Sequence, residues 1–438
     1  MTILSELRNK TAQISVIGLG YVGLPLAVEA GKAGYTVTGI DINEQKINML
    51  NRGENYIPDI RDEDISSLVT KGRLLATNDF KEIEKSDVII ICVPTPLDKN
   101  KQPSTKYIEE AVDSSIPFIR TGQLIILEST TYPGTTEEII LPRIEKKGLK
   151  VGKDFYLVFS PERIDPGNAN FKTYNIPKVV GGVTKECTKI AKTFYEQITS
   201  GGVLEVSSPR VAEMEKLLEN IFRIVNISLV NEMAMLCDRM NINIWEAISA
   251  AKTKPFGFMP FYPGPGTGGH CIPLDPFYLS WKAKEFDFST KFIELAGEIN
   301  DSMPEYIVNK VADTLNLHKK SLNGSRILII GMAYKKNISD TRESPSIKIA
   351  EQLLNKGAEI VYHDPLVSSI IICNKEYNSE NLSMELIKNS DLVLIATDHS
   401  IVDYNLISEN AALIYDSRNI SAENSNTYRL GYWRLLSK

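Results

Sequence analysis

Residues 13–43, QISVIGLGYVGLPLAVEAGKAGYTVTGIDIN, hold the feature that most constrains the fold, a glycine turn between a strand and a helix. Gly18 permits the tight turn, Gly20 lets the backbone approach a pyrophosphate, and Gly23 lets the helix pack on the strand. Asp41 ends the next strand at the distance expected for an acid that binds a ribose diol. Because an acid there repels a 2′-phosphate, this βαβ unit predicts an NAD-binding site rather than an NADP site.

The same alternation of strands and helices continues along the chain. Strand-like runs recur at 86–94, 123–130 and 155–163, separated by polar or helical segments. This pattern predicts an α/β fold with a mostly parallel, doubly wound sheet. A fresh α/β pattern begins at 325–335, SRILIIGMAYK, and predicts a second Rossmann-like domain, although its first turn lacks a full GxGxxG.

A long helix is predicted between the two α/β regions. Ser208 can cap it, Pro209 can take its first position, and helical periodicity runs from Val211 to about Met240. Because its apolar residues cover more than one stripe, we expect it to be buried on several sides, to join the two domains and to contact a second subunit. These residues are Met214, Leu217, Leu218, Ile221, Phe222, Val225, Leu229 and Met233.

Composition excludes several classes of protein. With 43% hydrophobic and 24% charged residues, the chain has an ordinary globular composition, and its net charge of -6 argues against nucleic acid as the main partner. Five dispersed cysteines without a CxxC pair and four scattered histidines predict no disulfide framework and no protein-bound metal. The polar N-terminus and the lack of a bilayer-length apolar stretch predict a cytoplasmic protein with no membrane partner.

Two segments carry candidate catalytic side chains. Lys216 and Asn220 in VAEMEKLLENIFR lie four residues apart and so share one helix face. A lysine on a largely buried helix needs a partner or a chemical role. A surface lysine paired with Glu213 or Glu219 is the alternative.

The loop GTGGHCIPLDP, residues 266–276, presents a lone thiol, Cys271, among glycines. A thiol near a nicotinamide suggests aldehyde oxidation, in which the thiolate adds to the carbonyl and the adduct gives up hydride to leave a thioester. Water then releases the acid. A cysteine that only fills space is the alternative.

Eight motifs occur in an order that matches a known family: GLGYVGLPLA, VPTPLD, LESTTYPGTT, FSPERIDPGN, AEMEKLLEN, GPGTGGHCIPLDPFYL, GMAYKKNISDTRESPS and DSRN. Over nearly its whole length the chain resembles the UDP-sugar 6-dehydrogenases, the UDP-glucose/UDP-mannuronate dehydrogenase superfamily. The resemblance implies an NAD-binding Rossmann domain over 1–206, a central dimerising region with the cysteine loop over 207–318, and a UDP-sugar-binding domain over 319–438. It implies oxidation of the sugar C6 hydroxyl to a carboxylate with two NAD+, and a homodimer or higher homo-oligomer.

By matching position, the resemblance assigns the catalytic roles. Cys271 resembles the nucleophile that captures the C6 aldehyde, and Lys216 and Asn220 resemble the pair that stabilises the developing oxyanion. Asp275 resembles the aspartate that acts with the lysine and a water in proton removal. Glu162 resembles the acid that helps to hydrolyse the thioester, with Thr130 holding the water.

The resemblance also assigns binding residues. Those for NAD are Gly18, Gly20, Tyr21, Val22, Gly23, Asp41, Pro94, Thr95, Thr130 and Arg342. Those for the UDP-sugar are Glu162, Arg163, Lys216, Asn220, Tyr262, Gly268, Tyr334, Lys335 and Arg418.

The identity of the sugar is read from departures within the family. UDP-glucose enzymes typically have a serine before the cysteine, a PEFL stretch and a lysine before the aspartate, where this chain has His270, PERIDPGN and Leu274. These departures resemble the branch that acts on UDP-N-acetylhexosamines, and SPERIDPGN with STTYPGTT is most similar to UDP-N-acetylglucosamine 6-dehydrogenases of surface polysaccharide synthesis. UDP-N-acetylmannosamine, UDP-N-acetylgalactosamine and UDP-glucose remain alternatives. So do a two-electron hydroxyacid dehydrogenase and a nucleotide-sugar-binding regulator without activity.

Overall fold

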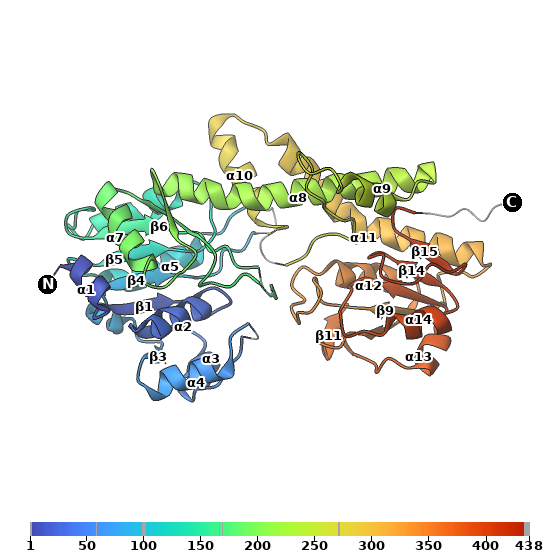
Figure 1. The fold of residues 1–438 in the computed structure, drawn as a ribbon, viewed down its shortest axis with the longest axis horizontal. Coiled ribbons are helices and arrows are strands. Elements are labelled where there is room, and N and C mark those ends of the chain that lie inside the picture. Colours follow the sequence, from blue (N-terminus) through green and yellow to red (C-terminus); the bar gives the residue numbers. More distant parts are fainter. Residues whose placement is uncertain are drawn as a thin grey trace. The chain divides into compact units, whose positions relative to one another are not determined.

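The chain forms two compact units, shown in the computed structural model of Figure 1. The structure describes residues 2–57, 59–98, 102–165, 167–168, 170–269 and 272–432. The N-terminal unit comprises Met1–Glu219 and Phe277–Phe288, and the C-terminal unit comprises Asn220–Pro276 and Ser289–Lys438. The long helix α8 (Pro209–Met240) belongs to both, because the division falls within it. The predicted limits of the NAD-binding, central and UDP-sugar-binding regions stay predictions.

The N-terminal unit is built on an eight-stranded sheet in the order β3-β2-β1-β4-β5-β6-β7-β8. The first six strands in this order are parallel, β7 runs antiparallel to β6, and β8 is parallel to β7. This is the strand order of a dinucleotide-binding fold extended by two strands, so the predicted α/β fold with a doubly wound sheet is confirmed. The strands are β1 (Gln13–Ile17), β2 (Thr36–Ile40), β3 (Leu74–Thr77), β4 (Val88–Ile91), β5 (Leu124–Leu127), β6 (Tyr156–Phe159), β7 (Lys178–Gly182) and β8 (Val203–Val206).

Helices cover both faces of this sheet, and strand alternation explains why. Along β4 the side chains of Val88 and Ile90 enter one hydrophobic cluster, while Ile89 and Ile91 enter another. Successive residues of a strand point to opposite faces, so a strand of four apolar residues is buried on both. The main helices of the unit are α2 (Gly23–Ala33), α3 (Glu44–Asn51), α4 (Asp62–Thr70), α5 (Lys106–Ser115), α6 (Leu141–Glu145) and α7 (Lys185–Tyr195).

The C-terminal unit has its own core on a second parallel sheet, in the order β10-β9-β13-β14-β15. This confirms the second Rossmann-like domain, whose first turn after β9 uses Gly331 at φ +87°. Its strands are β9 (Arg326–Ile330), β10 (Glu359–His363), β13 (Leu392–Ile395), β14 (Ile414–Asp416) and β15 (Thr427–Arg429), with a hairpin of β11 (Ser369–Ile372) and β12 (Lys375–Asn378). Its helices are α9 (Ile244–Ala251), α11 (Lys291–Leu317), α12 (Pro345–Asn355), α13 (Met384–Lys388) and α14 (Tyr404–Asn410).

Helix α8 begins at Pro209, and the Val211 amide lies 3.4 Å from the Ser208 hydroxyl oxygen, as the predicted cap requires. The expectation that its apolar residues are buried on several sides is wrong for the chain by itself. Leu217 is fully buried, whereas Leu218 is 62% and Leu229 is 51% exposed. The helix therefore has one buried face, which mixes apolar and polar side chains, and an apolar stripe that this chain leaves uncovered.

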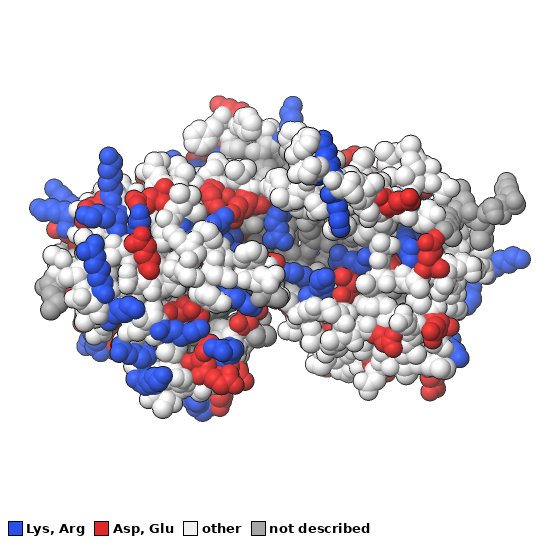
Figure 2. All heavy atoms as spheres, viewed as in Figure 1, with Lys and Arg blue, Asp and Glu red and all other residues white. Residues whose placement is uncertain are grey.

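Side chains of both charge signs lie on the face of the molecule that Figure 2 shows. On the visible face of the N-terminal unit, basic and acidic side chains are interspersed rather than gathered in one region (Figure 2). Among the described residues, no helix combines the length and apolar character that a bilayer crossing requires.

Candidate functional site

The glycine turn between β1 and α2 has the geometry that its sequence predicts. Gly18 has φ +92°, and a Cβ on it would lie 2.6 Å from the Cys92 carbonyl oxygen. A Cβ on Gly23 would lie 1.9 Å from the Gly18 carbonyl oxygen, so only glycine lets the helix start this close to the turn. A Cβ on Gly20 would meet no atom within 4 Å. The backbone is thus open at the position where a pyrophosphate would approach, and the turn fits a dinucleotide.

Asp41 directly follows β2 and is held by backbone donors. Its Oδ2 accepts from the Leu19 amide at 2.8 Å and its Oδ1 from the Asn43 amide at 2.9 Å. A carboxylate has about four acceptor sites, so both oxygens keep capacity for ribose hydroxyls. Tyr21 is partly exposed on the turn and Val22 immediately precedes α2.

The segment after β4 carries Pro94 and Thr95. The Thr95 carbonyl oxygen accepts a hydrogen bond from the hydroxyl of Tyr278 in α10 (Asp275–Ala283). This bond anchors α10 to the predicted cofactor segment within the N-terminal unit. Thr130 is half-buried in the loop that follows β5.

That loop is held by Glu213, a residue that sequence reasoning considered only as an ion-pair partner. Its carboxylate accepts from the Gly134 amide at 2.5 Å, the Thr136 amide at 2.9 Å and the Thr136 hydroxyl at 2.7 Å. Burial raises the pKa of Glu213, and the hydrogen bonds from Gly134 and Thr136 oppose that rise. Glu213 lies three residues before Lys216, so α8 fixes the Thr130 loop and presents the lysine within one turn.

Lys216 and Glu162 are brought together. The Lys216 ammonium is buried and donates to the main-chain oxygen of Glu162 at 2.6 Å. The Glu162 carboxylate accepts from the Arg163 amide at 2.7 Å and the Ile164 amide at 2.8 Å. Pairing of Lys216 with Glu213 or Glu219 is not what the structure shows, because Glu213 caps the loop and Glu219 pairs with Arg163, whose Nε lies 3.0 Å away.

Asn220, one turn further along α8, binds Asp275. Its side-chain amide donates to Asp275 Oδ2 at 2.6 Å, and both side chains are buried. Asp275 is the first residue of α10, directly after the cysteine loop. The candidate nucleophile Cys271 and its neighbour His270 lie outside the described residues.

The candidate substrate residues of the C-terminal unit gather around the glycine-rich segment 264–269. A Cβ on Gly268 would lie 2.6 Å from the Tyr334 Cβ, and one on Gly264 would lie 2.6 Å from Nη1 of Arg418. Arg418 follows β14, and its Nε donates to the Ala396 carbonyl oxygen at 2.8 Å. Burial lowers the pKa of Arg418, and the nearby carboxylates of Asp398 and Asp416 oppose that fall.

The other residues of this unit that the sequence predicts to bind NAD or the UDP-sugar include Arg342, Lys335 and Tyr262. The Arg342 carbonyl oxygen accepts from the Gly269 amide at 2.9 Å, while the Arg342 guanidinium pairs with Asp340 at 2.6 Å. Lys335 is half-buried after Tyr334. Tyr262 is exposed and its ring stacks on Trp245 at 6.2 Å between centroids.

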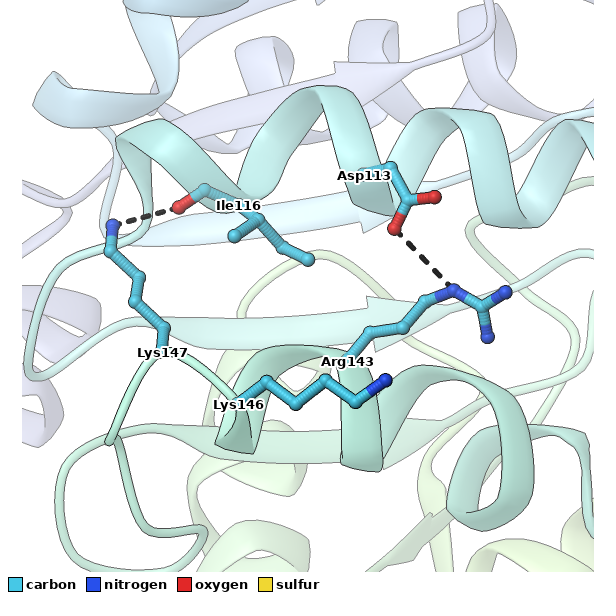
Figure 3. A pocket seen from close by; sticks show the side chains of 5 residues that line it. All are labelled: Asp113, Ile116, Arg143, Lys146 and Lys147. Carbon is cyan, nitrogen blue, oxygen red and sulfur yellow. Dashed lines mark hydrogen bonds and ion pairs between the residues drawn. The ribbon is translucent and has the colours of Figure 1, made fainter.

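Two surface pockets on the N-terminal unit differ in whether predicted site residues line them. One, of about 560 Å³, is lined by Asp113, Ile116, Arg143, Lys146 and Lys147 (Figure 3). Within this pocket Arg143 Nε lies 3.4 Å from Asp113, and Lys147 donates to the Ile116 carbonyl oxygen at 2.7 Å. It includes none of the predicted site residues. The other, of about 420 Å³, contains Tyr21 of the glycine turn and Ile164 next to the Glu162 segment. Among the described residues, no group of His, Cys, Asp and Glu is arranged to hold a metal ion.

Sequence reasoning missed Glu128 and Lys178, two buried charged residues beside Glu162. Lys178 Nζ lies 3.0 Å from Glu162 Oε2 and 3.1 Å from Glu128 Oε1. The available signal was a charged residue at the border of an apolar run, in LIILEST and in PKVVGG. A charged residue in that position is usually solvated, so the pattern by itself does not indicate a buried ion pair.

Comparison with known proteins gives matches along nearly the whole chain. Models of the UDP-glucose/GDP-mannose dehydrogenase family match with the NAD-binding domain at residues 12–199, the central domain at 210–302 and the UDP-binding domain at 328–423. A UDP-N-acetyl-D-glucosamine 6-dehydrogenase of Pseudomonas aeruginosa is 38% identical over 361 residues, 82% of this chain and 84% of that protein. A UDP-N-acetyl-D-mannosamine dehydrogenase of Methanococcus maripaludis is 37% identical over 395 residues, 89% and 86% of the two chains. The solved structure of a UDP-D-ManNAc dehydrogenase from Pyrococcus horikoshii superposes with a TM-score of 0.87 at 33% identity, covering 96% of this chain and 99% of that one.

Proposed function

The chain belongs to the UDP-glucose/GDP-mannose dehydrogenase family, with NAD as its cofactor, and from this premise we propose that it oxidises the C6 hydroxyl of UDP-N-acetylglucosamine to the carboxylate. The proposal assigns two successive NAD-dependent oxidations to one site, with a covalent thioester on Cys271 between oxidation and release. The acid so formed is a building block of surface polysaccharide.

The observation that most supports the proposal is that two side chains on one face of α8 make buried hydrogen bonds. Lys216 donates to the Glu162 main chain, and one turn later Asn220 donates to Asp275, with all four residues buried. Buried charged and polar groups paired in this way are typical of a reactive site rather than of a solvated helix face. They are also the residue types that alcohol oxidation and thioester hydrolysis need.

The roles of the side chains follow from their chemistry. NAD+, when bound through the Gly18–Gly23 turn and Asp41, supplies the acceptor for the hydride of each oxidation. Lys216 stabilises the negative charge that develops on the sugar oxygen as Asp275, acting through a water, receives the hydroxyl proton. Asn220 keeps the Asp275 carboxylate oriented.

The second half of the reaction uses the thiol. The Cys271 thiolate adds to the C6 aldehyde, and the resulting hemithioacetal loses hydride to become a thioester. A water held by Thr130 and activated by the Glu162 carboxylate then attacks the acyl carbon. The C–S bond breaks, the acid leaves, and the thiol is regenerated.

The choice of sugar rests on His270, Leu274 and the PERIDPGN segment, and on the P. aeruginosa relative named as a UDP-N-acetyl-D-glucosamine 6-dehydrogenase. UDP-N-acetylmannosamine is the second candidate, because relatives of similar identity are named as dehydrogenases of that sugar. The two sugars differ only in configuration at C2, so the contacts of one acetamido group separate them.

The test is NADH formation with UDP-N-acetylglucosamine, UDP-N-acetylmannosamine, UDP-N-acetylgalactosamine and UDP-glucose. We expect two NADH per UDP-N-acetylglucosamine consumed and a kcat/KM at least about tenfold above the other sugars, a difference of about 1.4 kcal/mol. One NADH per substrate would indicate a two-electron dehydrogenase. Tight UDP binding with no NAD+ reduction would indicate a regulator.

Substitution of the thiol tests the covalent step. Cys271→Ser should stop the second oxidation, so that acid production falls at least about a thousandfold while UDP and NAD+ affinities stay within about twofold. Acid production at the wild-type rate would contradict the thioester.

The uncovered stripe of α8 supports a homodimer. Leu218, Phe222, Leu229 and Leu236 recur at helical spacing and are each more than 40% exposed. We expect Leu218→Glu with Leu229→Glu to convert a dimer to monomers in analytical ultracentrifugation, because each change places a charge in an apolar contact. Glu substitution of exposed Leu75 on β3 is the control, and dimers that persist in the double variant would contradict the assignment.

A further inference from the structure

We propose that Lys178 is a positioning residue that holds the Glu162 carboxylate in place, and thereby sets the rate of thioester hydrolysis. This inference rests on the proposed function, since it acts through the role given there to Glu162. It concerns a buried group of three charged side chains, Glu128, Glu162 and Lys178, hereafter the buried triad.

Sheet topology explains how the triad forms. Glu128 directly follows β5 and Glu162 lies just beyond β6, so both lie at the carboxyl edge of the parallel strands. Strand β7 runs the other way, with Gly181 paired to Phe159. Extending that register by three residues places Lys178, the first residue of β7, opposite Glu162. The reversal of one strand therefore brings a cation to an edge where two carboxylates already lie.

The contacts between the three side chains of the buried triad are short, and solvent is largely excluded from them. Lys178 Nζ lies 3.0 Å from Glu162 Oε2 and 3.1 Å from Glu128 Oε1, and none of the three residues is more than 7% exposed. Burial by itself lowers the pKa of Lys178, but the carboxylates of Glu128 and Glu162 outweigh burial and raise it above its ordinary value. Lys178 is therefore a permanent cation, and removing it would leave buried carboxylates without their counter-charge.

The two carboxylates are not equivalent. The Glu162 carboxylate accepts from two backbone amides as well as from Lys178. Burial raises the pKa of Glu128, whose Oε2 has no hydrogen-bond partner among the described groups. Glu162 is therefore the more fully held of the two carboxylates.

Other titratable groups surround the triad. They are Cys92 after β4, Tyr195 at the end of α7, Lys216 on α8 and Arg163 next to Glu162. The Tyr195 hydroxyl donates to Glu128, and its ring centroid lies 5.2 Å from Lys178 Nζ. Lys216 contacts the main-chain oxygen of Glu162 and not its carboxylate. Among the described residues, Lys178 is thus the cation that touches the carboxylate.

The experiment compares Lys178→Met, the double variant Glu128→Gln/Lys178→Met, and Lys178→Arg in the full-length enzyme. The double variant removes both other charges of the triad, so it stays informative if the single change fails to fold. Lys192→Met is the matched control, because Lys192 forms an exposed ion pair with Glu205 on the same unit at 2.6 Å. The measurements are kcat, KM for the UDP-sugar, and acyl-enzyme trapped by acid quench and weighed by mass spectrometry.

We expect the double variant to lose about tenfold in kcat at pH 7 with KM changed less than about twofold, within the range of general-base effects. Acyl-enzyme should accumulate. Lys178→Arg should recover kcat to within about threefold of wild type, and Lys192→Met should match wild type throughout.

Wild-type kcat in the double variant, with no accumulation of acyl-enzyme, overturns the inference. So does a loss of activity in Lys178→Arg as large as in Lys178→Met, because that result would follow from packing alone. If wild type reduces no NAD+ with any UDP-sugar, the proposed function fails first. The inference is then judged by infrared difference spectra against Glu162→Gln, in which an unchanged Glu162 carboxylate band at pH 7 in the double variant overturns it.

Discussion

Gly20 and Gly23 of the glycine turn have different surroundings, so we expect them to have different roles. Gly23 faces the Gly18 carbonyl oxygen at a distance that no side chain tolerates, whereas Gly20 faces open space. Gly20 also lies outside the residues with positive φ, so alanine can adopt its backbone conformation. We therefore expect Gly23 to be required for folding and Gly20 to be required for binding NAD+.

This separation predicts opposite phenotypes for two alanine substitutions. Gly23→Ala should lower the Tm by about 5 °C or more, since overpacking against backbone costs about 1–3 kcal/mol. Gly20→Ala should leave the Tm within about 2 °C but raise the Kd for NAD+ at least about tenfold, because its methyl group occupies the approach of the pyrophosphate. Calorimetry and fluorescence titration measure the two effects, and wild-type NAD+ affinity in Gly20→Ala would contradict the assignment.

At the scale of elements, α8 carries an unusual density of charged groups in contact with the rest of the N-terminal unit. Glu213 caps the loop after β5, Lys216 reaches the Glu162 main chain, and Glu215 and Glu219 flank Arg163. Desolvation, and then the neighbouring Glu219, raises the pKa of Glu215 to about 7. Glu215 is therefore a residue of α8 whose raised pKa lies close to neutral.

The shift of Glu215 gives a stability prediction with a definite sign. Its pKa is raised in the folded state, so the folded protein binds the extra proton between about pH 4.5 and 7, and the stability from this proton is lost as the pH rises through that window. Glu215→Gln removes the titration. The variant should match wild type near pH 5 and exceed it by about 1 kcal/mol above pH 7.5, a value reduced for partial solvent screening. Urea unfolding across pH measures this, and a difference that is the same at both pH values would contradict it.

At the scale of the molecule, two α/β units each have their own sheet and hydrophobic core. The family models match an NAD-binding domain to the first and a UDP-binding domain to the second. The residues that we propose to face a ligand are the glycine turn and Asp41 in the first unit, and Tyr334, Arg418 and segment 264–269 in the second. We therefore expect each unit to have a ligand site of its own.

Hydrogen exchange should report the two sites separately. NAD+ alone should protect amides of residues 18–24 and 41–43, and UDP alone should protect residues 331–343 and 416–418, because bound ligand stabilises the local structure that it contacts. Gly20→Ala should abolish the first protection and keep the second. UDP protection confined to the glycine turn would contradict the assignment of the second unit.

Local patterns in the sequence predicted several structural features of this protein. The fold class, the NAD turn with its acid, the second α/β region and the start of α8 could be read from the sequence, because each depends on spacing within one element or on residues next to it. The face shared by Lys216 and Asn220 also followed from helix periodicity. Tertiary structure decided what those residues touch, and it showed that α8 leaves an apolar stripe uncovered. The buried triad could not be foreseen, because Glu128, Glu162 and Lys178 meet only through the reversed direction of β7, and strand direction is a property of the assembled sheet.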